Sequence, residues 1–205
     1  MTELLSPAGG REALVAAVQN GADAVYMGFG SFNARRSARN FSDEEFLAAV
    51  RYCHLRGVKV YLTLNTLVTD RELPALADAA RVASECGVDA ILVQDWGVLA
   101  TLQKIIPDVP LHASTQMSLH TLSGVKESAR LGMTRAVLAR ELNRGEIAEI
   151  CKKSPIEIET FVHGALCMCV SGQCYMSAFL GGRSGNRGSC LLYTSPSPRD
   201  GATSR

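Results

Sequence analysis

The first 164 residues of the chain alternate between amphipathic stretches and short apolar runs. Four of the amphipathic stretches end at a glycine, and an apolar run follows each glycine. These four runs are Ala24–Met27, Val58–Leu62, Ala90–Val93 and Arg135–Leu138. Glycine suits the left-handed position that ends a helix, and apolar runs rich in β-branched residues suit strands that are buried on both faces. The pattern therefore predicts a repeated unit of helix followed by strand.

The remaining apolar stretches extend this unit along the chain. Further strands are predicted at Leu4–Leu5, Pro110–Ser114 and Ile156–Val162. Helices are predicted at Arg11–Gln19, Arg71–Ser84, Leu119–Arg130 and Asn143–Lys152. Another helix begins after Ser42, which forms a capping box with Glu45 three residues later. Each of the seven strands is thus separated from the next by a helix or a helix-like segment, and this alternation indicates a parallel sheet.

Two parallel architectures fit this alternation, an open doubly wound sheet and a closed barrel. The regular units, without a long switch connection, favour the barrel. A complete barrel takes about 250 residues, so we predict an incomplete parallel (β/α) TIM-like barrel of about seven strands over residues 1–164. Residues 165–190 form a segment rich in cysteine and glycine at the carboxyl ends of the strands, and residues 191–205 form a Ser/Pro/Arg tail without helical or strand period. We expect this tail to be disordered and foreign to the fold.

The charge balance changes the picture of the partners. The chain has 21 Lys+Arg against 20 Asp+Glu and a net charge of +1, which argues against a large electrostatic footprint for nucleic acid. No apolar run reaches the roughly 18 residues of a membrane span, and no secretory signal follows Met1. We therefore expect a cytoplasmic protein with no membrane partner.

Polar side chains follow several of the predicted strands at the end where parallel barrels carry their chemistry. We take His163, His112 and Gln116 as candidate catalytic residues, and Asn65, Gln94, Arg140 and Glu141 as candidate substrate-binding residues. Such a rim of amides, one guanidinium and two imidazoles suits a polar, planar ligand. The alternative for each residue is loop solvation or helix capping. A basic stretch after the second strand adds Asn33, Arg35 and Arg36, either as phosphate or carboxylate contacts or as a solvated loop.

The cysteines divide into a scattered group and a compact one. Cys53, Cys86 and Cys151 lie in helical patterns and are predicted to be core thiols. Cys167, Cys169, Cys174 and Cys190 fall within 24 residues. A compact group of thiols outside a disulfide framework is typical of metal sites or catalysis, and thiolates select zinc, Cu(I) or iron–sulfur clusters. The spacing Cys-x-Cys-x4-Cys differs from the paired C-x2-C of a zinc ribbon, whereas iron–sulfur clusters accept irregular spacing.

The segment around these cysteines resembles the signature of the peptidase U32 family. The similar residues are Glu159-x-Phe161-x-x-Gly164-Ala165-Leu166-Cys167, Gly172-x-Cys174-x-Met176-Ser177 and Asn186-Arg187-Gly188-x-Cys190. Leu5-Ser6-Pro7-Ala8-Gly9, Gly21-Ala22-Asp23-Ala24-Val25-Tyr26 and His112-Ala113-Ser114-Thr115-Gln116 are also similar, so the resemblance covers Met1 to Cys190. After Cys190 the sequence departs from the family, and we expect the family sequence to be truncated there.

The resemblance implies a barrel-like domain with a 4Fe-4S cluster that acts in oxygen-independent hydroxylation. Family members modify a pyrimidine of tRNA or ribosomal RNA to its 5-hydroxy form or hydroxylate the ubiquinone ring, and the collagenase-like protease label is older. Cys167, Cys174 and Cys190 match the cluster cysteines, Cys169 matches no ligand position, and the fourth ligand stays unassigned. The expected partner is RNA or a small aromatic substrate, and the expected assembly is a homo- or hetero-oligomer.

Three functions follow for the chain. The first is an iron–sulfur enzyme that hydroxylates an RNA pyrimidine. The second is a peptidase, for which Cys167 and His163 lie four residues apart but without an evident residue to orient the base. The third is a structural zinc site that closes the barrel without catalysis.

Overall fold

The computed structural model describes residues 2–30, 32–33, 41–164, 167, 169–182, 184–187 and 190. Its sheet has seven strands in the order β1-β2-β3-β4-β5-β6-β7, and each strand pairs in parallel with the next. The strands are β1 (Leu5–Pro7), β2 (Ala24–Gly28), β3 (Lys59–Leu64), β4 (Ala90–Val93), β5 (Leu111–Ala113), β6 (Arg135–Val137) and β7 (Glu157–Glu159). The predicted α/β class and the incomplete parallel barrel of seven strands are confirmed.

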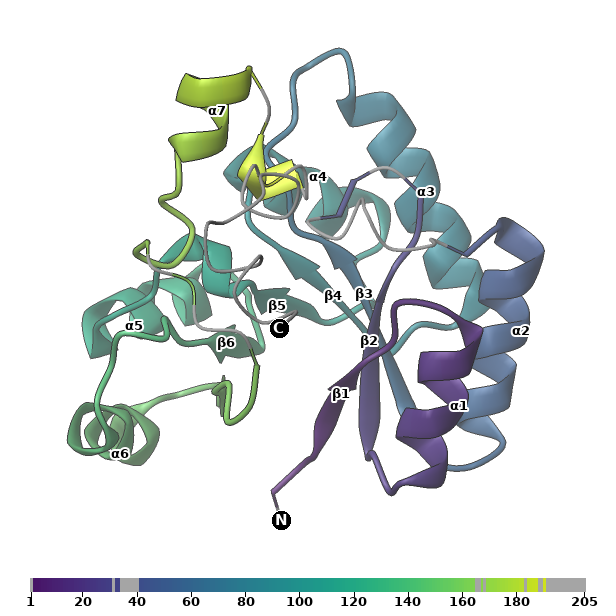
Figure 1. The fold of residues 1–205 in the computed structure, drawn as a ribbon, viewed down its shortest axis with the longest axis horizontal. Coiled ribbons are helices and arrows are strands. Elements are labelled where there is room, and N and C mark those ends of the chain that lie inside the picture. Colours follow the sequence, from purple (N-terminus) through teal and green to yellow (C-terminus); the bar gives the residue numbers. More distant parts are fainter. Residues whose placement is uncertain are drawn as a thin grey trace, which may run out of the picture.

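Helices connect the strands and cover the outside of the sheet (Figure 1). They are α1 (Arg11–Gln19), α2 (Asp43–His54), α3 (Leu73–Cys86), α4 (Trp96–Ile105), α5 (Leu122–Arg130), α6 (Arg144–Lys153) and α7 (Met176–Gly181), with the short 3-10 helices η1 (Thr115–Met117) and η2 (Gly185–Arg187). Figure 1 shows α1, α2 and α3 together on one side, and α5 and α6 on the other. No helix in the described ranges is long and apolar enough to cross a membrane.

Most element boundaries differ from the sequence prediction by a few residues, as the examples of α4, α5 and β7 show. Helix α4 fills the predicted helix-like connection, because the Asp95 carboxylate accepts hydrogen bonds from the backbone of Gly97 and Val98 at 2.7 and 3.0 Å and caps the helix. Helix α5 begins at Leu122 rather than Leu119, since Thr121 is its capping residue. Strand β7 ends at Glu159 rather than Val162. The predicted capping box of Ser42 and Glu45 is present at the start of α2.

Side chains alternate along each strand between the helical layer and the barrel interior. On β3, Val60, Leu62 and Leu64 belong to the large apolar core under the helices, whereas Tyr61 faces inward. The interior cluster is small and consists of Ala24, Tyr61, Ala90, Leu92 and Val137, with Leu5 and Tyr26 against it. The buried polar side chains of His112 and Arg135 lie against Tyr61 of this cluster.

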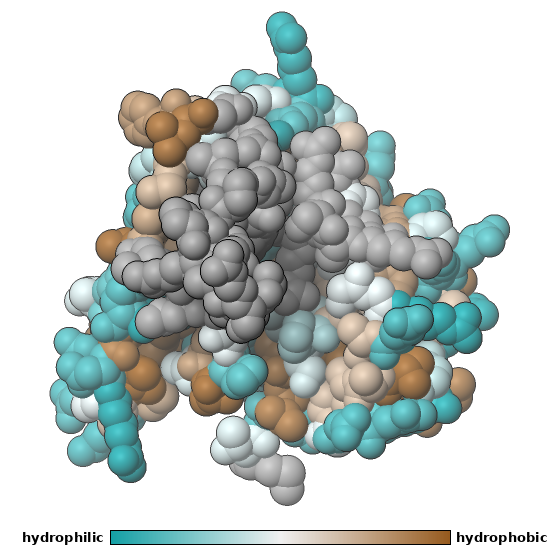
Figure 2. Space-filling model, in the orientation of Figure 1, coloured by the Kyte–Doolittle hydropathy of each residue, from teal (hydrophilic) through white to brown (hydrophobic). Residues whose placement is uncertain are grey.

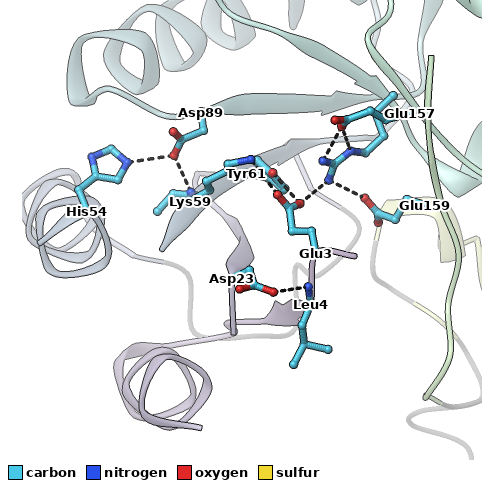
Figure 3. Close-up of polar contacts among 11 residues, drawn as sticks. Glu3, Leu4, Asp23, His54, Lys59, Tyr61, Asp89, Glu157 and Glu159 are labelled. Atoms are coloured by element: carbon cyan, nitrogen blue, oxygen red, sulfur yellow. Dashed lines mark hydrogen bonds and ion pairs between the residues drawn. The ribbon is translucent and has the colours of Figure 1, made fainter. Parts of the chain in front are cut away.

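At the amino-terminal end of the strands, a network of charges closes the interior (Figure 3). Arg135 at the start of β6 donates to Glu3 at 2.8 Å and to Glu157 at 2.6 Å. Glu3 also accepts hydrogen bonds from the Tyr61 hydroxyl and the Lys59 ammonium, both at 2.8 Å. Burial opposes ionisation of Glu3, but these donors outweigh it and lower its pKa to about 2.

Candidate functional site at the carboxyl ends of the strands

The rim formed by the carboxyl ends of the strands brings three of the predicted amide side chains together. Asn65 follows β3 and donates to the Ser114 hydroxyl at 3.2 Å, while Gln94 follows β4 and donates to the backbone carbonyl of Gln116 at 3.4 Å. The side-chain oxygens of Gln94 and Gln116 are buried and have no hydrogen-bond partner among the described residues. Because buried polar atoms are normally paired, this part of the rim has unused hydrogen-bond acceptors.

His112 lies within β5 and not at its end, so it sits inside the barrel below the rim. It is 4% exposed, and its ring meets the Tyr61 ring edge-on with the centroids 5.0 Å apart. Burial, together with the positive charge of Arg135, lowers the pKa of His112 to about 3. The imidazole is therefore neutral near pH 7, and its Nδ1 has no partner within the described part of the chain.

His163 and Asn33 do not join this group. His163 is exposed after β7, and the described residues give it no hydrogen bond. Asn33 is fully buried and donates to the Gly30 carbonyl at 3.2 Å. Its side chain covers Gly28, where an added Cβ would lie 2.6 Å from Asn33 Cγ. Arg35 and Arg36 lie outside the described residues. Asn33, which we expected to bind substrate, is thus packed into the fold and not presented on its surface.

The thiol segment, which we define as residues 165–190, is attached to the rim through Ser171. This residue is fully buried, and its backbone N–H and hydroxyl donate to Glu141 Oε1 at 2.9 and 3.1 Å. The Ser171 hydroxyl also accepts from the backbone N–H and Nε of Arg140 at 3.2 and 3.3 Å. The Ser118 hydroxyl donates to the Ser171 carbonyl. Every polar atom of Ser171 is therefore bonded to the rim.

Arg140 and Glu141 were predicted to bind substrate, and in the structure they hold the thiol segment. The second oxygen of Glu141 lies 3.1 Å from His120 Nε2, and His120 Nδ1 lies 2.8 Å from the Ser118 carbonyl. Burial opposes ionisation of Glu141, but the hydrogen bonds from Ser171 outweigh it and lower its pKa. Ser118 has a φ of 58°, the left-handed conformation that non-glycine residues adopt rarely. Backbone strain of this kind gathers at functional sites.

Gly172 brings the thiol segment into direct backbone contact with the rim. It has a φ of +78°, and a Cβ at this position would lie 2.3 Å from the Gln116 carbonyl oxygen. Only glycine permits both the conformation and the approach. The segment therefore lies directly over Gln116, next to the unused acceptors of the rim.

A second attachment lies on the other side of the rim. Arg187 in η2 donates to both oxygens of Glu72 at 2.6 and 2.8 Å and to the Leu67 carbonyl at 2.7 Å. The hydrogen bonds from Arg187, and then those from Thr69, hold the pKa of Glu72 well below its usual range. Leu67 and Glu72 belong to the connection between β3 and α3. The thiol segment is thus tied to the barrel at two points that are far apart in sequence.

The four cysteines of the thiol segment lie near one another. The hydrogen bond to the Cys174 thiol raises the pKa of Cys169, and the electrostatic influence of Cys167 and Cys190 raises it further. None of the seven cysteines forms a disulfide. Among the described residues, no three cysteine, histidine or acidic side chains stand in an arrangement that would already hold a metal ion. The thiols are gathered at one place without being in a ligating geometry.

The other three cysteines lie in the outer helices. Cys53 in α2 is buried, and burial raises its pKa to about 11. Cys86 in α3 is half-buried against the apolar core. Both agree with the prediction of core thiols. That prediction is wrong for Cys151, which is exposed on α6, because it lies on the outer face of its helix.

Beyond Cys174 the thiol segment presents an apolar surface. Met176, Phe179 and Leu180 in α7 are exposed, as is Tyr175 before the helix. Figure 2 shows the corresponding brown patch at the upper left, where α7 lies in Figure 1. Phe161 and Val162, which follow β7, are exposed as well.

Sequence reasoning missed several of the residues that attach the thiol segment. The sequence places a turn at Gly172 before Cys174, but it does not indicate the contact with Gln116. Ser118, His120 and Glu72 had none, since their partners lie more than 20 residues away in the sequence.

The fold and site together define a parallel β/α protein with a thiol-rich segment over the carboxyl ends of its strands. The model of peptidase family U32 matches residues 9–193. The chain therefore belongs to this family, as the sequence resemblance indicated.

Curated relatives carry two kinds of name. A 23S rRNA 5-hydroxycytidine synthase of Escherichia coli is 45% identical over 92% of this chain and 28% of its own length. The tRNA hydroxylation protein P1 of Bacillus subtilis is 39% identical over 92% of this chain and 44% of its own length. A collagenase of Porphyromonas gingivalis is 36% identical over 92% of this chain and 48% of its own length. The chain thus spans half or less of the length of each of these relatives.

A solved structure agrees with the fold. The structure of a U32 peptidase matches with a TM-score of 0.66 and 20% identity, covering 78% of this chain and 68% of that chain. At this identity the likeness supports the fold alone. The relatives named above carry names of RNA hydroxylation or of a collagenase.

Proposed function

We propose that this chain is part of an iron–sulfur enzyme that hydroxylates a pyrimidine base of tRNA or ribosomal RNA. The observation that carries the proposal is that four neighbouring thiols belong to a segment whose Ser171 and Gly172 lie against the rim, which also holds the unused acceptors of Gln94 and Gln116. The names of the Escherichia coli and Bacillus subtilis relatives support an RNA substrate. Action on such RNA would take place in the cytoplasm, as the sequence predicts.

The donor set fits an iron–sulfur cluster. Thiolates are soft ligands that select iron–sulfur clusters, zinc or Cu(I), and a 4Fe-4S cluster takes about four of them. Cys167, Cys174 and Cys190 would be the ligands that the family resemblance implies. Cys169 lies against Cys174 and is the candidate for the fourth. A bound cluster would supply one-electron redox chemistry at the rim.

The chain's own residues would bind and orient the base. A pyrimidine presents N–H donors on its pairing edge, and the carbonyl oxygens of Gln94 and Gln116 are acceptors without partners among the described residues. RNA-modifying proteins read splayed-out bases by hydrogen bonds to that edge. Gly172, which lies against the Gln116 backbone, would help to exclude water from this side of the rim. The catalytic roles predicted for His112, Gln116 and His163 stay predictions.

Metal analysis of anaerobically purified full chain tests the proposal. We expect iron and sulfide in equal amounts, about four of each per chain, and broad visible absorbance. The loaded protein, supplied with unmodified RNA and with an anaerobic cell extract as the source of the oxygen donor and the two-electron oxidant, is expected to raise the mass of one pyrimidine nucleoside by one oxygen atom. Stoichiometric zinc without sulfide would overturn the proposal and favour the structural zinc site. Bound iron with unchanged RNA would overturn RNA as the substrate.

The name of the Porphyromonas gingivalis collagenase makes peptidase activity the second candidate function. Nucleophilic peptidases need a base beside the nucleophile. Within the described ranges, no histidine nitrogen is hydrogen-bonded to a cysteine thiol or a serine hydroxyl. Cleavage of denatured collagen by metal-free protein, abolished in a Cys167→Ala variant, would establish this activity in place of hydroxylation.

A further inference from the structure

The attachment of Ser171 to Glu141 has the properties of a positioning device. Ser171 lies between Cys169 and Cys174, two residues after the first and three before the second. Its N–H, carbonyl and hydroxyl are all bonded to residues that follow β5 and β6. A residue bonded through every polar atom cannot shift without breaking several hydrogen bonds at once. The thiols on either side of it are therefore fixed relative to the barrel.

Glu141 is the centre of this attachment. One of its oxygens accepts both hydrogen bonds from Ser171, and the other lies 3.1 Å from His120. A carboxylate that accepts several hydrogen bonds holds its partners more tightly than a neutral group does. Gly172 completes the arrangement, because its backbone packs so closely against Gln116 that an added Cβ would overlap the Gln116 carbonyl.

We propose that Glu141 and Ser171 are positioning residues that set the arrangement of Cys169 and Cys174 over the barrel rim. The proposal rests on the proposed function, since the residues would act through a cluster held by these thiols. Residues that orient metal ligands without touching the metal typically affect metal affinity about 10- to 100-fold when they are changed. Arg187 and Glu72 would position Cys190 in the same way, because Glu72 lies in the connection between β3 and α3 and binds Arg187.

The first experiment measures the attachment without reference to iron. Hydrogen–deuterium exchange of the Ser171 amide is followed in the full chain, because that amide donates directly to Glu141. Glu141→Ala is expected to accelerate this exchange about tenfold, the effect of one net hydrogen bond. Glu141→Gln keeps an acceptor oxygen and is expected to retain most of the protection. Glu127→Ala, which removes an exposed carboxylate from α5, is the matched control and should change nothing.

The second experiment measures the thiols. Anaerobically reconstituted protein is challenged with EDTA, and the decay of the visible absorbance is recorded. Glu141→Ala and Ser171→Ala are expected to lose iron about tenfold faster than the parent chain, and Glu141→Gln is expected to be intermediate. If Glu141→Ala fails to fold, Gly172→Ala replaces it, with Gly182→Ala as control. Gly182 has a similar φ of +58° but no atom within 4 Å of an added Cβ.

The outcomes separate the two proposals. Unchanged exchange of Ser171 in Glu141→Ala would overturn the attachment itself. Faster exchange with unchanged iron retention would overturn the positioning role and leave the contact merely structural. A parent chain that takes up no iron would overturn the proposed function, while the exchange experiment would still decide the attachment.

Discussion

Glu3 and Arg135 are 132 residues apart in the sequence, yet their side chains meet at 2.8 Å inside the barrel. Glu3 precedes β1, and Arg135 opens β6, so the contact crosses the interior between strands that are not neighbours in the sheet. The Arg135 side chain is only 9% exposed. Figure 3 shows how Tyr61, Glu157 and Glu159 surround the same place. The open sheet is thus closed at its amino-terminal end by charge rather than by an eighth strand among the described residues.

Glu3→Gln should destabilise the chain by about 2 kcal/mol, because it leaves Arg135 half-paired in the interior. The pKa of Glu3 is lowered to about 2 from 4.5, so its contribution to stability is complete above pH 4.5 and is lost as the pH falls towards 2. Urea unfolding at pH 7 and at pH 3 measures both effects. Glu127→Gln, in an exposed pair with Arg130, is the control and should leave the free energy of unfolding almost unchanged. Equal effects of the two variants would contradict the buried network.

His112→Gln should flatten the pH dependence of stability between pH 6.5 and 4. The folded protein lowers the pKa of His112 from 6.5 to about 3, so the unfolded chain binds a proton that the folded chain refuses. Stability is therefore lost as the pH falls below 6.5, by about 1.4 kcal/mol for each pH unit well below that value. Thermal melts at several pH values compare the variant with the parent chain. Identical slopes would show that His112 is protonated in the folded state.

The effect of replacing a cysteine on iron binding should depend on where that cysteine lies. Cys167→Ala and Cys174→Ala should abolish iron binding in anaerobic reconstitution, since each removes a proposed ligand. Cys86→Ala should leave iron binding intact and cost about 1 kcal/mol of packing, and Cys151→Ser on the surface of α6 should affect neither. Cys169→Ala tests whether Cys169 is the fourth ligand. Unchanged iron content in this variant would mean that Cys169 does not bind the cluster. Iron retained in both Cys167→Ala and Cys174→Ala would disprove the shared site.

Gly28→Ala should destabilise the fold by about 1 to 3 kcal/mol through overpacking. Its Cβ would lie 2.6 Å from Asn33 Cγ, so the fully buried Asn33 side chain would have to leave its position in the fold. The double variant Gly28→Ala with Asn33→Ala should be less destabilised than the sum of the single variants, as expected for residues in contact. Additive effects in urea unfolding would mean that the two positions do not touch.

The fold could be predicted from the sequence because its elements depend on local patterns of residues. The runs at Val58–Leu62 and Ala90–Val93 and the capping box of Ser42 each depend on neighbouring residues, and all appear in the structure. The amide rim was predictable for the same reason, since parallel strands deliver their ends to one edge.

The attachments of the thiol segment were not accessible in this way. Glu141 had the polarity of a substrate ligand, and nothing in its own neighbourhood indicates Ser171, 30 residues further on. His112 was placed at the rim because it lies near the end of an apolar run, but the period of two along β5 turns it inward. Pairs of residues that are far apart in the sequence can be identified only once the assembled barrel is known.

The two attachments of the thiol segment also fix an order of events in the maturation of the chain. Ser171 finds its partners only after β5 and β6 have taken their places, and Arg187 finds Glu72 only after β3 and α3 have done so. Contacts between such distant parts of a chain form late in folding. The cysteines would come together last, so the proposed cluster would be inserted only after the barrel has assembled, and a chain that fails to fold would offer no binding site for it.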